Sequence, residues 1–320
     1  MDTNRKLISL CVCCYNEEEN IDETYRQIIN VIDRVPECDF EILFADNSST
    51  DKTQEKIRII AQNDKRVKAI FNSTNFGPNM SGVNLALNAS GDALISLPAD
   101  LQEPIDMIPN FIEYWLQGYD VVFGSKTSSE ENPITFFCRK VYYKIINMMS
   151  DVEELYQVTG FGLIDRRVYN VMWDTIIQDP FIDIRHYIVK YGFRVKLIPY
   201  KQLSRKAGKS SYSIYNLYSH AITSLCATSI KPLRYMTILG ILLGTISFLV
   251  ALVYLFYKIT HWYSFDLGIA PAVIGLFFLS GFHLFCIGII GEYIIVLLRK
   301  VTIEPRVTEK ERINFDQKDE

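Results

Sequence analysis

The chain has 320 residues, and its formal net charge is −4. This charge gives no reason to expect nucleic-acid binding, which is usually marked by a basic domain or patch. The seven cysteines are an odd number, which argues against a disulfide framework and favours small buried side chains. The only apolar run near the start, 7–14, is short and soon followed by glutamates, so we expect no signal peptide and a cytoplasmic N-terminal part.

The first 125 residues alternate strand-like and helix-like stretches. Short apolar runs predict strands at 8–14, 40–45, 67–71, 93–97 and 121–123, and residues 21–35 have helical spacing. This alternation predicts a mostly parallel sheet covered on both faces, in which ligands bind beyond the carboxyl ends of the strands. One crevice is therefore expected to gather the polar residues that follow the strands, namely Asn16, Glu17, Asp46, Asp100 and Gln102.

Two stretches of the middle region, 136–149 and 212–230, are amphipathic. Apolar residues of the second recur at helical spacing, which fits either a helix packed on the core or one lying on a membrane surface. No Asp or Glu occurs between Asp183 and Asp266, whereas Lys and Arg are frequent there. A basic, acid-free segment before an apolar span favours anionic headgroups or a phosphate as its partner.

Two long apolar stretches, 236–257 and 268–298, lie in the last third of the sequence. Each exceeds the ~20 residues that a helix needs to cross a bilayer. Lys and Arg flank the outer ends of the pair, whereas the link between them carries only Lys258. The positive-inside rule predicts a helical hairpin with both termini in the cytoplasm. The charged tail after Arg306 is expected to be mobile.

Asp100 and Gln102 stand two residues apart at a predicted strand end. In an extended segment this spacing points both side chains the same way. Carboxylate and amide oxygens are suitable ligands for a divalent cation, which would neutralise a diphosphate leaving group. Acidic loops are common, however, so the pair alone does not establish a metal site.

Seven short motifs follow one another along the chain: Tyr15-Asn16-Glu17, Asp46-Asn47-Ser48-Ser49-Thr50-Asp51, Asn75-Phe76-Gly77, Asp100-Leu101-Gln102-Glu103-Pro104, Gly124-Ser125-Lys126, Arg205-Lys206-Ala207-Gly208-Lys209-Ser210-Ser211-Tyr212 and Gly291-Glu292-Tyr293. In their order and spacing the chain resembles, from about Leu7 to Pro305, the family 2 glycosyltransferases, and within them the polyprenyl-phosphate glycosyltransferases. Any one match is weak, but their order together with the trailing hairpin makes the resemblance specific.

This resemblance implies an α/β fold: a GT-A (Rossmann-like) glycosyltransferase domain with amphipathic interfacial helices and a C-terminal two-helix transmembrane hairpin. The expected domains are a cytoplasmic catalytic domain at 1–210, an interfacial helix at 211–234, two transmembrane helices at 235–300 and a cytoplasmic tail at 301–320. The implied activity is inverting transfer of a sugar from a nucleotide-sugar, first of all UDP-glucose or a related UDP-sugar, to polyprenyl (undecaprenyl) phosphate at the cytoplasmic face of the inner membrane. Membrane lipid is a further partner, nucleic acid is not expected, and a homo-oligomer is left open.

The resemblance also implies residue roles. The nucleotide would be lined by Tyr15, Asn16, Glu17, Asp46 and Asn75, and Asp100 with Gln102 would hold Mg²⁺ or Mn²⁺ and the diphosphate. The acceptor phosphate would be met by Lys126, Arg139 and Arg205, with Ser210 nearby. A polyprenyl phosphate is already an anionic nucleophile, so the enzyme would act mainly by positioning and charge neutralisation.

Three departures from the family pattern bear on these roles. Pro98 stands where an acidic residue is common, Asn47 replaces a second Asp, and Lys126 replaces Arg. Pro98 leaves one carboxylate, one amide and the phosphates of the substrate to hold the cation. A non-catalytic, degenerate family member that serves as a scaffold is therefore one alternative. A processive polysaccharide synthase is the other, although the run 202–206 lacks the tryptophan typical of those enzymes.

Overall fold

The computed structural model describes residues 5–128, 148, 155, 157–178, 184–202, 222, 226, 229–260, 269–301 and 307–315. Contacts within the chain divide it into two units. The first unit contains a β-sheet with the helices that pack on it. The second contains two long apolar helices, α9 (Lys231–Thr260) and α10 (Ile269–Val301).

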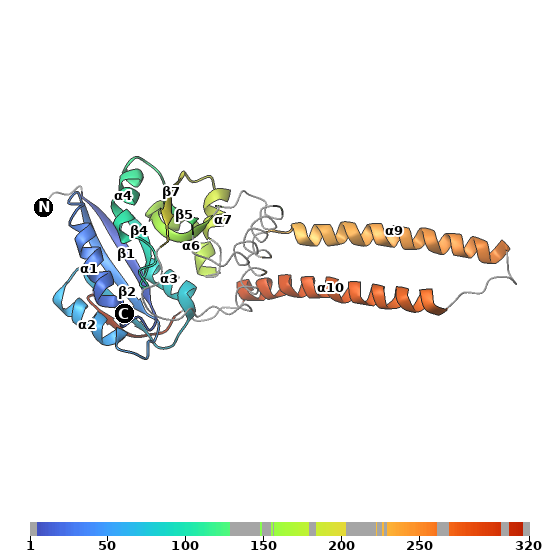
Figure 1. Cartoon of the computed structure of the whole chain (residues 1–320), viewed down its shortest axis with the longest axis horizontal. Helices are drawn as coiled ribbons and strands as arrows, with labels where there is room; N and C mark the ends of the chain where they lie inside the picture. Colours follow the sequence, from blue (N-terminus) through green and yellow to red (C-terminus); the bar gives the residue numbers. More distant parts are fainter. Residues whose placement is uncertain are drawn as a thin grey trace. The chain divides into compact units, whose positions relative to one another are not determined.

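A single sheet of eight strands, in the order β7-β5-β6-β4-β1-β2-β3-β8, runs through the first unit (Figure 1). The strands are β1 (Lys6–Cys14), β2 (Cys38–Asp46), β3 (Val67–Asn72), β4 (Ala93–Pro98), β5 (Val121–Ser128), β6 (Val158–Asp165), β7 (Val195–Lys201) and β8 (Glu309–Ile313). The pairs β1–β2, β2–β3, β1–β4 and β5–β7 are parallel, whereas β6 is antiparallel to β4 and β5, and β8 to β3. The predicted, mostly parallel α/β sheet is confirmed.

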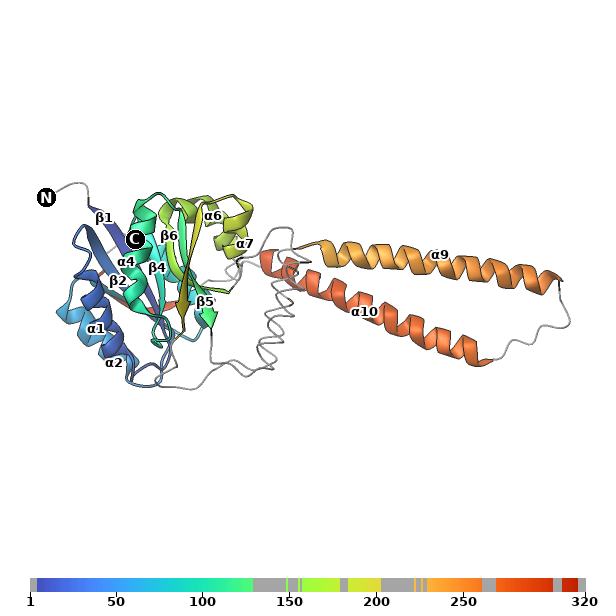
Figure 2. The ribbon, with the colours of Figure 1, turned by 45° about the horizontal axis from the view of Figure 1, so that its top comes forward.

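Helices cover both faces of this sheet because side chains alternate along each strand (Figure 2). On β1, Leu10 and Val12 join a core with α1, α2 and α4, whereas Cys11 joins a core beneath α3. A third core packs α6 and α7 against β5 and β6. The helices are α1 (Ile21–Ile32), α2 (Thr53–Asn63), α3 (Gly77–Asn88), the short η1 (Ile105–Met107), α4 (Ile108–Leu116), α6 (Arg166–Gln178) and α7 (Ile184–Lys190).

The six cysteines in the described part of the chain are free. Cys11 and Cys14 are buried in the first strand, and Cys13 is half-buried beside them. Burial raises the pKa of the Cys13 thiol to about 12. These thiols are therefore protonated at neutral pH and act as small apolar side chains.

Gly82 occupies the interior of α3 without a steric reason for glycine. A Cβ at this position would meet only the Cys13 Sγ, at 4.0 Å, which is an ordinary contact. In a helix interior alanine is more favourable than glycine by ~1 kcal/mol, so we expect Gly82→Ala to stabilise the protein by about 0.5–1 kcal/mol. Thermal unfolding of the detergent-purified full chain measures the effect. Gly77, at a φ of 82°, is the matched control, because Gly77→Ala is strained there and should lower the Tm.

The C-terminal tail contradicts the sequence-based expectation of mobility at residues 307–315. Here β8 extends the sheet at the edge strand β3. Glu311 forms an ion pair with Arg58 of α2, with Nη2 and Oε2 2.8 Å apart. Asn314, at a φ of 61°, donates to the carbonyl oxygens of Ala61 and Val67 at 2.6 and 2.8 Å. The open edge of β3 supplies backbone partners that local charge patterns do not reveal.

Asp64 joins the end of α2 to the strand that follows. Its carboxylate accepts hydrogen bonds from the Arg66 guanidinium (2.8 Å), the Arg66 backbone N–H (2.9 Å) and the Tyr25 hydroxyl (2.9 Å). The Arg66 guanidinium is the main cause that lowers the pKa of Asp64 to about 2.

A lowered pKa in the folded state makes this contribution to stability complete above the ordinary Asp pKa of 3.8 and progressively lost as the pH falls towards about 2. We expect the Tm of the wild-type protein to fall between pH 5 and pH 3. Asp64→Asn should show a lower Tm at pH 5 and a smaller decrease between the two values. Equal decreases in both proteins would contradict this role of Asp64.

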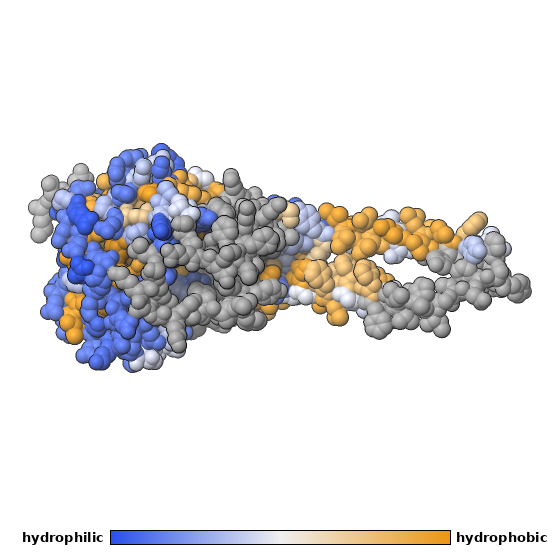
Figure 3. Space-filling view, viewed as in Figure 1, coloured by the Kyte–Doolittle hydropathy of each residue, from blue (hydrophilic) through white to orange (hydrophobic). Residues whose placement is uncertain are grey.

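The helices α9 and α10 correspond to the two predicted spans. Windows at Lys231–Val250 and Phe278–Leu298 have mean hydropathies of 1.8 and 2.1. Large apolar side chains along both helices are exposed, and Figure 3 shows the apolar surface that they form. Both helices are long and apolar enough to cross a membrane. The Tyr293 hydroxyl of α10 donates to the carbonyl oxygen of Ser229, two residues before the start of α9, at 2.7 Å. This bond joins the last part of α10 to the start of α9. The predicted interfacial helices, 136–149 and 212–230, fall almost entirely outside the described residues.

Candidate active site

The loops that follow β1 and β2 are hydrogen-bonded to each other. The Asn16 N–H donates to the Ser49 hydroxyl at 2.9 Å, and the Asn16 Oδ1 accepts from the Thr50 N–H at 2.9 Å. The Glu17 N–H donates to the Thr53 hydroxyl at 2.9 Å. Asn16 has a φ of 53°, a left-handed conformation that asparagine tolerates better than most residues. The structure therefore brings Asn16 and Glu17 to the end of β2, as the sequence predicts.

Asp46, the last residue of β2, is fully buried. Its Oδ2 accepts from the Ser49 N–H at 3.0 Å and from the Gln54 Nε2 at 2.7 Å. Its Oδ1 has no hydrogen-bond partner. A buried acceptor without a donor costs about 1–3 kcal/mol, so this oxygen is suited to an N–H or O–H of a ligand. Tyr15, which is 42% exposed at the end of the neighbouring strand, offers a ring for stacking.

The turn between β3 and α3 is held by Asn47. The Asn47 Nδ2 donates to the Asn75 Oδ1 at 2.7 Å, and the Asn47 Oδ1 accepts from the Phe76 N–H at 3.0 Å. The same oxygen accepts from the Asn72 Nδ2 at 3.1 Å. An amide can donate and accept at once, which explains how this chain uses Asn at a position where the family has Asp. The amino-acid sequence shows that Asn47 departs from the family pattern, but it does not reveal this role of the Asn47 amide.

The loop after β4 carries Asp100 and Gln102. The Asp100 Oδ1 accepts from the Gln102 N–H at 3.2 Å, and the Gln102 Oε1 accepts from the Gln202 Nε2 at 3.2 Å. Leu101 between them has a φ of 58°, so the segment is a turn and not an extended strand. The expectation that the two side chains point the same way because the segment is extended is therefore wrong. Gln202, at the end of β7, is a neighbour that sequence reasoning missed.

Glu103 is a second carboxyl group beside Asp100 and is only 8% exposed. Burial, and then the charge of Asp100, raises the pKa of Glu103, while the charge of Lys126 opposes the rise. The Tyr200 hydroxyl lies 3.5 Å from the Glu103 Oε1. In the sequence, the feature that could have marked Glu103 as a site residue is its place inside the Asp100–Pro104 motif.

The oxygen donors of this loop fit a hard divalent cation only with outside help. The described residues include no group of three or more His, Cys, Asp or Glu side chains that could hold a metal ion. Asp100 and Gln102 offer a carboxylate and an amide oxygen, and Mg²⁺ commonly takes its other ligands from water and substrate phosphates. The residues therefore fit a cation that is completed by a diphosphate.

Among the residues expected at the acceptor phosphate, Lys126 is the one that the structure describes. It lies on β5, half-buried, and its backbone N–H donates to the Gln157 carbonyl oxygen at 3.0 Å. Arg139, Arg205 and Ser210 lie outside the described residues.

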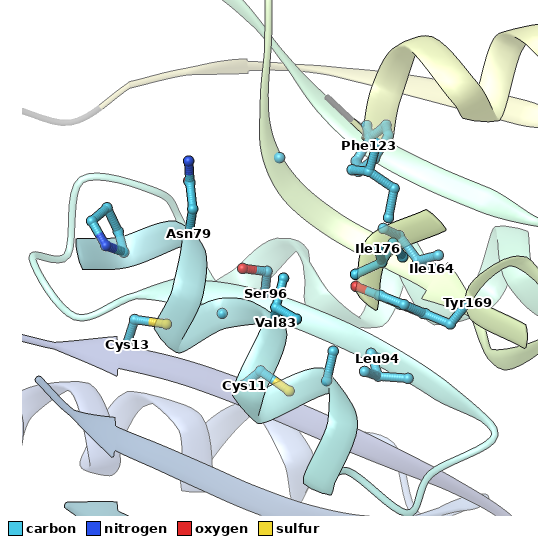
Figure 4. Close-up of a pocket in the computed structure, with 15 residues that line it drawn as sticks. Cys11, Cys13, Asn79, Val83, Leu94, Ser96, Phe123, Ile164, Tyr169 and Ile176 are labelled. Atoms are coloured by element: carbon cyan, nitrogen blue, oxygen red, sulfur yellow. The ribbon is translucent and has the colours of Figure 1, made fainter. Parts of the chain in front are cut away.

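A cavity of about 240 Å³ opens on the α3 and α6 face of the sheet (Figure 4). Val83 and Ala86 of α3 and Leu94 of β4 contribute apolar walls, and Asn79 and Ser96 add polar atoms. The described residues that line it carry no formal charge. The cavity is therefore suited to an uncharged group and not to a phosphate.

Comparison with known proteins agrees with this geometry. The fold is similar to that of mannosyl-3-phosphoglycerate synthase from Rubrobacter xylanophilus, with a TM-score of 0.51 and 14% identity over 68% of this chain and 71% of that chain. The sheet and the polar loops at its strand ends define a glycosyltransferase domain of the GT-A fold.

Relatives extend the match beyond this domain. The glycosyl transferase family 2 model matches residues 9–173. "Uncharacterized glycosyltransferase YkcC" of Bacillus subtilis is 32% identical over 295 residues, 89% of this chain and 88% of that protein. "Bactoprenol glucosyl transferase" of Shigella phage SfV is 28% identical over 296 residues, 90% of this chain and 92% of that protein. The chain belongs to glycosyl transferase family 2 and is a glycosyltransferase.

Proposed function

We propose that this chain transfers a sugar from a nucleotide-sugar to a polyprenyl phosphate at the cytoplasmic face of a membrane. The observation that carries the proposal is the match to a relative named bactoprenol glucosyl transferase, which covers 90% of this chain. A match of that extent reaches beyond the sheet unit into the apolar helices. The buried, unpartnered Asp46 Oδ1 supports a nucleotide at the strand ends.

The proposed reaction is an inverting, in-line displacement. A phosphate oxygen of the acceptor attacks the anomeric carbon, a new C–O bond forms, and the bond to the nucleoside diphosphate breaks. Asp46, Asn75 and Tyr15 bind the nucleotide in this proposal, and Asn16 and Glu17 shape its pocket. Asp100 and Gln102 would hold Mg²⁺ or Mn²⁺, which stabilises the charge on the leaving diphosphate. Lys126, Arg139 and Arg205, with Ser210, attract the acceptor phosphate.

The sheet supports a membrane hairpin with both ends on one side. Strand β8 follows α9 and α10 in sequence, yet it pairs with β3, which precedes them. One sheet cannot lie on both sides of a bilayer, so this pairing supports an even number of crossings between the two segments. Lys231 and Arg234, before the first span, favour the cytoplasm as that side.

The test is transfer by the detergent-purified full chain. It would be incubated with undecaprenyl phosphate, Mg²⁺ and radiolabelled UDP-glucose, other UDP-sugars and GDP-mannose, with label measured in the lipid extract. Label in the lipid that disappears with EDTA supports the proposal and the metal. Donor binding without transfer or hydrolysis would favour the scaffold alternative, to which Pro98 gives weight. A growing, water-soluble polymer would indicate a processive synthase.

A further inference from the structure

The C-terminal strand contacts the turn that precedes α3. The Ser73 N–H donates to the Thr308 carbonyl oxygen at 2.9 Å, and the hydroxyl oxygens of Ser73 and Thr308 are 2.5 Å apart. The next residues, Asn72 and Glu309, are partners in the sheet. Residues 308 and 309 therefore fix the point at which the chain leaves β3 for the Asn75 turn.

From this point, side-chain hydrogen bonds continue to Asn75. The Asn72 side chain is 1% exposed and donates to Asn47, which in turn donates to Asn75. The Glu309 Oε1 accepts from the Asn84 Nδ2 of α3 at 2.8 Å. The tail thus supports the turn from its start and through the helix that follows it.

A second series of contacts runs from the same strand to Asp46. The Glu311 carboxylate accepts from the Arg58 Nε at 3.0 Å and from its Nη2 at 2.8 Å. The Arg58 Nη2 also donates to the Gln54 Oε1 at 3.4 Å, and the Gln54 Nε2 donates to the Asp46 Oδ2 at 2.7 Å. The free Oδ1 of Asp46 is therefore oriented by a group whose position depends on Glu311.

We propose that β8, together with Thr308 just before it, is a structural part of the donor site, in which Thr308 and Glu311 are positioning residues for the Asn75 turn and for Asp46. This rests on the proposed function, which assigns Asp46 and Asn75 to the nucleotide. The donor site is then complete only when the segment that follows both apolar helices has docked on the sheet. The physical reason is pre-organisation, because polar loop groups held in place before binding lose less entropy when the nucleotide arrives.

The first experiment removes and restores the strand. Full-length protein and a variant that ends at Arg306 would be purified in detergent and titrated calorimetrically with UDP, and separately with GDP, in the presence of Mg²⁺. We expect the truncated protein to bind nucleotide at least tenfold more weakly. A synthetic peptide of residues 307–315 should restore the affinity when it is added in trans.

Point variants keep the proposal testable if the truncated protein does not fold. Thr308→Val removes the hydroxyl but keeps the shape, and Glu311→Ala removes the partner of Arg58. Each is expected to raise the nucleotide Kd and the donor KM by ~3–10-fold, with the acceptor KM and kcat nearly unchanged. Thr308→Ser should restore the wild-type value.

Two control variants on the tail separate positioning from stability. Lys310 is exposed on β8 between the test residues, so Lys310→Ala should change neither Tm nor Kd. Asn314→Gly keeps the left-handed backbone but removes the bonds to Ala61 and Val67, so it should lower the Tm and leave the nucleotide Kd unchanged.

The outcomes distinguish this inference from the proposed function. If the wild-type chain binds neither UDP nor GDP and transfers no sugar, the proposed function fails and the inference fails with it. If the wild type binds nucleotide and both test variants bind it equally well, the inference alone is wrong. The inference is also overturned if every variant with a lower Tm, Asn314→Gly included, binds nucleotide more weakly, because β8 would then act only through stability.

Discussion

Asp100→Ala is expected to lower sugar transfer by ~100-fold or more, because it removes the charge that would hold the cation at the leaving diphosphate. Asp100 is only partly buried, and its carboxylate accepts a local hydrogen bond from the Gln102 N–H. The free energy of unfolding should therefore change by less than about 1 kcal/mol. Transfer rates and thermal unfolding of the same preparation would measure both effects.

Asp100→Asn is the control for the shape of the turn. The amide oxygen can still accept from the Gln102 N–H, so the turn at Leu101 is kept while the charge is lost. If the charge is essential, the Asn and Ala variants should be similarly inactive at all Mg²⁺ concentrations. Near-normal turnover in Asp100→Asn would show that another residue holds the cation or that none is needed.

Glu41→Leu is expected to destabilise the sheet unit by about 3 kcal/mol or more, the range found when one partner of a buried pair is removed. Glu41 is 5% exposed and forms an ion pair with Lys68 at 2.7 Å. It also accepts from the Ser9 hydroxyl at 2.6 Å and from the Ser90 N–H at 2.5 Å. Leucine would leave all these donors without an acceptor in the core between β1, β2 and β3.

Glu41→Gln separates the charge from the hydrogen bonds. Burial tends to raise the pKa of Glu41, but the bonds from Lys68, Ser9 and Ser90 outweigh it and lower that pKa. Glutamine can still accept from Ser9 and Ser90, so it should cost clearly less stability than leucine. Tm values from thermal unfolding of the three proteins would test this order, and equal losses for Gln and Leu would contradict it.

The sequence predicts the strands and helices of the first 125 residues and both apolar helices, because each has a local hydrophobic pattern. Strand β8 is different: Glu309–Ile313 is almost entirely charged, and it forms a strand because β3 offers an open edge. That partner is remote in sequence, so no local pattern reveals it. The same holds for Arg58, whose ion-pair partner Glu311 lies more than 250 residues away.

The candidate site divides in a similar way. The apolar runs and the polar residues that follow them predicted Asn16, Glu17, Asp46, Asp100 and Gln102 at strand ends, and the structure has them at or just after the ends of β1, β2 and β4. Contacts between separate segments, such as Gln102 with Gln202 and Asn47 with Asn75, depend on the packing of loops and could not be derived from spacing. The left-handed Leu101 is a local feature that residue type alone does not predict. The roles of Arg139, Arg205 and Ser210 stay predictions.

The position of β8 has a consequence for biosynthesis. The ribosome makes β3 early, and the open edge of β3 exposes unpaired backbone groups until β8, the last part of the sheet, is made. At ~5–20 residues per second, that interval lasts on the order of ten seconds or more, and both apolar helices are synthesised within it. In the proposed topology, if only one of the two helices crosses the bilayer, β8 emerges on the opposite side of the membrane from β3 and cannot close the edge. The open edge would then mark a misinserted chain for aggregation or degradation, so completion of the sheet reports that insertion has succeeded.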